Sequence, residues 1–112
     1  MNVRTQVLLW TAQRASAAVL AVCVVVHLVT IIYAVRNGLS AAEILGRTRG
    51  NAGWAVFYFV FVAAIAVHAP IGLRSVLAET FGWRGRGLDV AMLAVAMTLL
   101  MWGVRAVIAV LV

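Results

Sequence analysis

The stretch WAVFYFVFVAAIAVHAPIGL, residues 54–73, decides the fold, because it contains one histidine and no Asp, Glu, Lys or Arg. A helix that crosses the hydrocarbon core of a bilayer needs roughly 20 apolar residues. Of the 112 residues in the chain, 66% are hydrophobic and 11% are charged. A soluble domain of this size leaves much of its surface in water and could not hide so much apolar surface. We therefore expect a membrane protein.

Two further apolar runs, residues 15–35 and 88–104, are also long enough to span a bilayer, and an apolar tail follows to residue 112. None of the runs alternates apolar and polar residues as barrel strands do, so we expect helices. The sequence predicts an all-α membrane protein with three transmembrane helices in a single domain, residues 1–112. The expected helix bounds are about 8–35, 53–79 and 88–111.

The segments outside these runs are short. Ser40 is followed three residues later by Glu43, which is the capping-box pattern of a helix start. We expect a short interfacial helix over about residues 40–46. The residues before Arg14 are expected to form a short amphipathic lead into the first span.

All nine positive residues are arginines, and the formal net charge is +6. In so apolar a chain, this charge points to lipid headgroups and membrane topology and not to nucleic acid. Five arginines flank one side of the predicted spans and four lie on the other. Because positive residues are enriched on the cytoplasmic side, this distribution predicts a cytoplasmic N-terminus.

Both histidines, His27 and His68, lie inside predicted spans. Ionisable groups in the hydrocarbon are costly and indicate functional sites by default. Neither histidine has an Asp or Glu at its own depth, which argues against a proton relay. A neutral imidazole can instead ligate a haem iron through one ring nitrogen while the other N–H finds an acceptor. The alternative for each is a packed histidine that binds nothing.

The second span carries a polar stripe, because residues four, seven and eleven apart share a helix face. The stripe consists of His68, Gly72, Ser75 and Glu79. Gly72 would let a flat macrocycle or another helix approach the backbone. Pro70 removes a backbone donor and predicts a local kink. Arg74 could curl back towards haem propionates or extend to the interface.

The first span carries a second stripe along one side. It consists of Gln13, Ser16, Leu20, Cys23 and His27. Arg14, at the entrance of this helix, is either an interfacial anchor or part of a quinone headgroup site. Such a site needs hydrogen-bond donors for the quinone carbonyls beside an apolar channel.

The depths of the two histidines predict separate sites. If Arg14 and Arg74 lie near one membrane face, a rise of 1.5 Å per residue places His27 roughly 20 Å above that face. The same reasoning places His68 roughly 9 Å above it. A gap of about 10 Å is too large for both imidazoles to ligate one iron. We expect two haems, each completed by a histidine from a partner subunit, with Arg105 near the outer propionates or simply at the interface.

Two short segments resemble the cytochrome b membrane-anchor subunits of succinate dehydrogenase and fumarate reductase. QRAS, residues 13–16, is similar to the His-Arg-x-Ser segment at the start of that family's first helix. HAPIGLRSVLAETFG, residues 68–82, is similar to its His-x-x-x-Gly-[Ile/Leu]-Arg segment, which an acidic residue and a turn follow. Here Trp10 stands where the family often has serine, and Ser75 stands where it has histidine.

The resemblance implies roles for individual residues. His68 would be the axial ligand of haem b, and His27 would suit members that carry two haems. We also expect Gly72, Arg74 and Arg105 near the haem groups, from the helix faces and depths described above. The resemblance puts the quinone near Arg14 and Ser16, beside the iron–sulfur subunit. We expect Gln13 and Trp10, which stand at the family's histidine and serine positions, at the same site.

The resemblance also implies an assembly in the bacterial inner membrane. The chain would be half of a haem-binding helix bundle that a second membrane-anchor subunit completes. Electrons would pass between an iron–sulfur subunit and a membrane quinone, while FAD and the iron–sulfur clusters would belong to the flavoprotein and iron–sulfur partners.

One alternative function is a haem-free structural anchor or assembly subunit. Another is a small transporter or proton channel, which the sparse polar lining disfavours.

Overall fold

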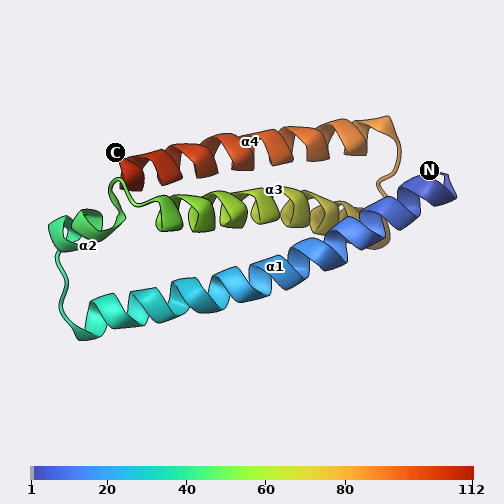
Figure 1. Cartoon of the computed structure of the whole chain (residues 1–112). Coiled ribbons are helices and arrows are strands. Elements are labelled where there is room, and N and C mark those ends of the chain that lie inside the picture. Colours follow the sequence, from blue (N-terminus) through green and yellow to red (C-terminus); the bar gives the residue numbers. More distant parts are fainter. Residues whose placement is uncertain (1) are drawn as a thin grey trace.

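The computed structural model describes residues 2–112, which form helices joined by short connections. In chain order these are α1 (Val3–Arg36), α2 (Ala41–Thr48), α3 (Ala52–Phe81) and α4 (Arg86–Leu111), as Figure 1 shows. Helices α1, α3 and α4 are each long and apolar enough to cross a membrane. The predicted all-α architecture with three spanning helices is confirmed.

The helices begin and end at residues suited to capping. Asn2 Oδ1 accepts a hydrogen bond from the Thr5 N–H at 2.8 Å. Ser40 Oγ accepts one from the Glu43 N–H at 3.2 Å, so the predicted cap of α2 is confirmed. Helix α3 ends at Gly82, whose φ of 65° is the left-handed conformation common after helix ends.

Two details differ from the sequence-based bounds. Helix α1 begins at Val3, so the expected lead is not a separate element. No glycine or proline interrupts residues 3–36, and the helix therefore has no reason to break before the span. Helix α3 runs through Pro70 as one helix and continues to Phe81.

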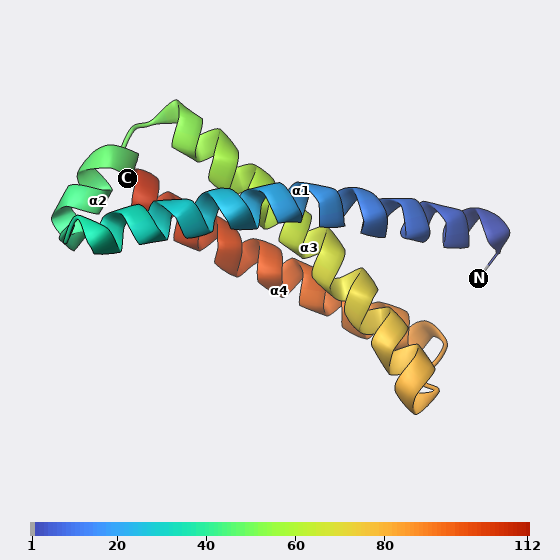
Figure 2. The same cartoon turned by 90° about the horizontal axis from the view of Figure 1, so that it is seen from below.

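Helix α3 is the centre of the bundle and packs against both α1 and α4. Helix α4 runs antiparallel beside it, while α1 crosses it at an angle, as Figures 1 and 2 show. At Gly103 of α4, an added Cβ would lie 2.5 Å from Val62 Cγ1 of α3. A small residue at this crossing lets the two backbones approach closely.

Helix α2 is attached to the end of α4. Thr48 Oγ1 donates a hydrogen bond to Val110 O at 2.6 Å, and the Gly50 N–H donates one to Leu111 O at 2.9 Å. The last carbonyls of a helix have no partner within it, so these bonds satisfy groups that would otherwise be unpaired. The connection between α1 and α3 is thereby held against one end of the bundle.

Most large apolar side chains face outward. Leu88 and Val107 are enclosed, with 0% and 3% of their surface exposed, whereas Val22 and Trp102 are 65% and 66% exposed. A surface of this kind is stable against lipid or another apolar protein surface and not against water. The chain is therefore suited to lie within a bilayer.

Candidate functional site

His68 contacts the first helix through Ser16. Its Nδ1 lies 3.4 Å from Ser16 Oγ, and Ser16 is only 7% exposed. The Ser16 hydroxyl donates to Gln13 O at 3.1 Å, which leaves its oxygen free to accept a hydrogen bond from a protonated His68 Nδ1. In that tautomer His68 Nε2 keeps its lone pair and could ligate a metal.

Gly72, one turn beyond His68, lies against the first helix. A Cβ built on Gly72 would lie 3.1 Å from Gln13 Nε2, so this approach is made by a side chain of α1. Within residues 2–112 the approach to Gly72 comes from a neighbouring helix, which is one of the two approaches that the sequence left open. Gly72 lies against Gln13, and His68 lies against Ser16. These two contacts join neighbouring turns of α3 to neighbouring turns of α1.

A pocket of about 290 Å³ opens between α1 and α3 near the N-terminal end of α1. We call it the arginine pocket, because it contains both Arg14 and Arg74. Its complete lining is Gln6, Leu9, Trp10, Gln13, Arg14, Ile71, Arg74 and Ser75. Arg14 Cζ lies 4.7 Å from the centre of the Trp10 ring, a cation–π contact.

The arginine pocket offers several hydrogen-bonding groups to a ligand. Gln13 Oε1 is buried and has no hydrogen-bond partner within residues 2–112. Two guanidinium groups, two amides and a hydroxyl belong to side chains of this lining and could donate to ligand oxygens. Three of the four predicted quinone residues, Trp10, Gln13 and Arg14, meet here. Ser16 is not part of this lining and is turned towards His68 instead.

Arg74 has a partner that the sequence did not indicate. Its Nε donates to Asp89 Oδ1 at 2.9 Å, and Asp89 belongs to the first turn of α4. The side chain of Arg74 is 22% exposed and that of Asp89 is 54% exposed. The sequence contains one indication of this ion pair. The connection between α3 and α4 is short, so residues on either side of it lie at similar depth in the membrane. Asp89 holds Arg74 at the edge of the arginine pocket.

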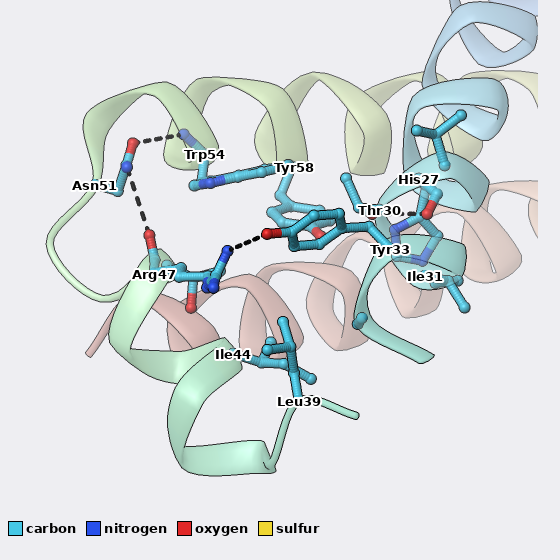
Figure 3. A pocket seen from close by; sticks show the side chains of 13 residues that line it. His27, Thr30, Ile31, Tyr33, Leu39, Ile44, Arg47, Asn51, Trp54 and Tyr58 are labelled. Atoms are coloured by element: carbon cyan, nitrogen blue, oxygen red, sulfur yellow. Dashed lines mark hydrogen bonds between the residues drawn. The ribbon is translucent and has the colours of Figure 1, made fainter. Parts of the chain in front are cut away.

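His27 belongs to a second and larger cavity, of about 700 Å³, at the α2 end of the bundle. We call it the α2 cavity, and Figure 3 shows its lining side chains. The His27 ring meets the rings of Tyr58 and Phe61 edge-on, with centroid distances of 5.9 and 5.6 Å. Its Nδ1 is buried and finds no hydrogen-bond partner in the described part of the chain.

The charged residue on this cavity is Arg47, from α2. Its Nη1 donates to the Tyr33 hydroxyl at 3.4 Å. Arg105, which the sequence placed near an outer haem, is exposed on α4 and does not line the α2 cavity. The signal for Arg47 in the sequence is its place in the last turn of the short amphipathic helix.

The two histidines lie at different depths. His68 is level with Ser16, and His27 is level with residues 58–61 of α3. At 1.5 Å per residue these registers separate the imidazoles by about 10 to 16 Å along the helices. No three His, Cys, Asp or Glu side chains gather into a metal site anywhere in residues 2–112. Each histidine could therefore offer one ligand to a site of its own.

The geometry is that of a membrane helix bundle with two separated imidazoles and a polar pocket at one end. Comparisons with curated proteins and with solved structures give no match. A family model described as the succinate dehydrogenase/fumarate reductase transmembrane subunit matches residues 1–112. The match covers the whole chain, so the protein belongs to the family of succinate dehydrogenase/fumarate reductase transmembrane subunits and is an integral membrane protein.

Proposed function

We propose that this chain is the haem b-binding membrane anchor of a succinate:quinone oxidoreductase complex. It would pass electrons between an iron–sulfur subunit and membrane quinone, and a flavoprotein subunit with FAD would carry out the dicarboxylate chemistry. The observation that carries the proposal is the His68–Ser16 contact beside the arginine pocket, in a chain of this family. The membrane would be the bacterial inner membrane, with the N-terminus on the cytoplasmic side.

His68 is the residue that would hold the first haem. Ser16 would accept a hydrogen bond from Nδ1–H and leave Nε2 for the iron, and such outer partners orient a metal-binding imidazole and raise its basicity. A second membrane-anchor subunit would supply a further histidine to the same iron, because this chain offers one imidazole at that site. The haem, when bound, supplies a one-electron carrier inside the membrane.

The arginine pocket is the proposed quinone site. Arg14 and Gln13 would donate hydrogen bonds to a quinone carbonyl, and Trp10 would shield the headgroup. Arg74 adds a second positive group, which its ion pair with Asp89 holds in place. Hydrogen bonds from charged donors strengthen as negative charge develops on the quinone oxygens during reduction.

His27 is the proposed ligand of a second haem in the α2 cavity. His27 lines the cavity, while its Nδ1 is buried with no hydrogen-bond partner within residues 2–112, so Nε2 is the ring nitrogen that would meet an iron. The cavity volume of about 700 Å³ leaves room for a macrocycle beside His27. The arrangement would stack two haems across the membrane.

A haem-free structural anchor is the second candidate. It is favoured by the edge-on packing of His27 against Tyr58 and Phe61, which needs no metal. The reduced-minus-oxidised absorbance spectrum of the purified complex separates the two. We expect a b-type absorbance change that decreases in His68→Ala, whereas a complex with no such change would retain only the anchoring role.

A further inference from the structure

The α2 cavity has one charged residue at its edge and none elsewhere in its lining. That residue is Arg47, and no carboxylate lines the cavity. Within residues 2–112 Arg47 forms no ion pair, since the nearby Glu43 accepts a hydrogen bond from Ser40 Oγ at 3.1 Å instead. The rest of the lining within residues 2–112 is uncharged and mostly apolar or aromatic, with Thr30, Thr48 and Asn51 as further polar side chains, so Arg47 is a single uncompensated cation.

The position of Arg47 is held from two directions. Its Cζ lies 5.4 Å from the centre of the Tyr33 ring, and its Nη1 donates to the hydroxyl of the same residue. The next residue, Thr48, is 7% exposed and bonds to Val110 O at 2.6 Å, which ties α2 to the end of α4. A guanidinium supported in this way loses little freedom when it binds an anion.

The cation and the unpartnered imidazole lie on opposite parts of the same cavity. His27 and Tyr33 are six residues apart on α1, a rise of about 9 Å. Figure 3 shows Arg47 beside the Tyr33 hydroxyl, with His27 further along the cavity beyond Tyr58. A ligand that fills this space would meet an imidazole with one part and a guanidinium with another.

We propose that Arg47 binds a carboxylate of the planar cofactor whose iron His27 ligates. Guanidinium and carboxylate form two parallel hydrogen bonds, and this geometry favours a carboxylate over a neutral ligand group. The inference rests on the proposed second haem, and it assigns the propionate contact to Arg47 in place of Arg105. Tyr33 is the positioning residue that keeps the guanidinium over the cavity.

The test is a redox titration of b-type absorbance in the purified complex, with Arg47→Gln as the variant. Arg49→Gln is the matched control, because Arg49 follows the same helix but does not line the cavity. Loss of the Arg47 charge leaves a carboxylate uncompensated, which favours the oxidised haem. We expect the oxidised-to-reduced ratio of one haem to rise about threefold to tenfold at fixed potential, where tenfold corresponds to 59 mV.

Haem counting and lipid analysis of the same samples separate the possible failures. The complex could contain two haems whose potentials change equally in Arg47→Gln and Arg49→Gln. That result would overturn the role of Arg47 and leave the two-haem proposal intact. A haem content that His27→Ala does not change would remove the second haem and this inference with it. Loss of phospholipid from Arg47→Gln, with both potentials unchanged, would identify an acidic lipid headgroup as the occupant and overturn the inference.

A more conservative variant tests whether Tyr33 positions Arg47. Tyr33→Phe keeps the aromatic ring under the guanidinium and removes only the hydroxyl that Arg47 bonds. We expect a shift of the same sign as in Arg47→Gln, but smaller. A shift of opposite sign would contradict the role of Tyr33 in holding Arg47.

Discussion

The arginine pocket and the α2 cavity differ in how their polar side chains find partners. Next to the arginine pocket His68 meets Ser16, and at its edge Arg74 pairs with Asp89, both at hydrogen-bonding distance. In the α2 cavity, by contrast, His27 Nδ1 has no partner among the described residues. Arg47 likewise has no carboxylate beside it in the cavity lining.

The difference indicates what each region needs from outside the chain. A buried polar group without a hydrogen bond costs about 1 to 3 kcal/mol, so unpartnered groups are retained where something else satisfies them. The arginine-pocket end is organised by this chain alone, with Gln13 Oε1 as the group left for a ligand. The α2 cavity would be completed only by a bound cofactor or a partner subunit.

The largest expected effect comes from removing either imidazole. We expect His68→Ala and His27→Ala each to lose one haem per complex, and the two lost centres to have different potentials. The reason is the separation of about 10 to 16 Å, which prevents a shared iron. Haem extraction combined with redox titration measures both quantities. If both variants lost the same centre, the two-level arrangement would be wrong.

The next effect concerns the quinone. Arg14→Ala removes a charged donor from the arginine pocket, and such hydrogen bonds contribute about 1.5 to 3 kcal/mol, or roughly 10- to 100-fold in kcat/KM for quinone. Succinate oxidation with an artificial acceptor should not change, because that reaction bypasses the pocket. Arg4→Ala is the matched control, since Arg4 lies on the same helix outside the pocket lining. Equal losses in both variants would argue against a quinone site here.

A smaller effect is expected from Asp89→Asn, which releases Arg74. Exposed ion pairs contribute about 0 to 1 kcal/mol, so kcat/KM for quinone should change by no more than about fivefold. The thermal stability of the complex should change little for the same reason. Steady-state kinetics and a melting curve check the two halves of this prediction. A complete loss of quinone reduction would mean that Asp89 itself takes part in the reaction.

The smallest effect is expected from Ser16→Ala. An acceptor on His68 Nδ1 makes the imidazole a stronger donor and favours ferric iron, so its removal should raise the potential of that haem. We expect roughly 30 mV, about a threefold change in the oxidised-to-reduced ratio. Ser16→Thr keeps a hydroxyl and should stay near the original potential. If the haem potential in Ser16→Ala were unchanged and quinone reduction were slower, Ser16 would belong to the quinone site and not to the haem site.

The fold could be predicted well because long apolar runs and helical rise are properties of local sequence. The runs predicted α1, α3 and α4, and the Ser40–Glu43 pattern predicted α2. The different depths of the two histidines also followed, because residue count sets distance along a helix. Helix α1 began earlier than expected because no helix breaker precedes the span.

The pairing of side chains across helices could not be predicted in the same way. The stripe on α1 contains both Gln13 and Ser16, but spacing along one helix does not say which neighbour each residue faces. Asp89 reaches Arg74 only because the α3–α4 turn folds back at that point. Arg47 lines the α2 cavity only because α2 is attached to the end of α4.

The central claim is that each imidazole is kept in the membrane to bind its own haem. A density map of the whole purified complex tests this most directly. We expect a macrocycle beside His68 and another in the α2 cavity beside His27, with a propionate next to Arg47. Side chains packed around both rings, with no macrocycle beside either, would contradict it.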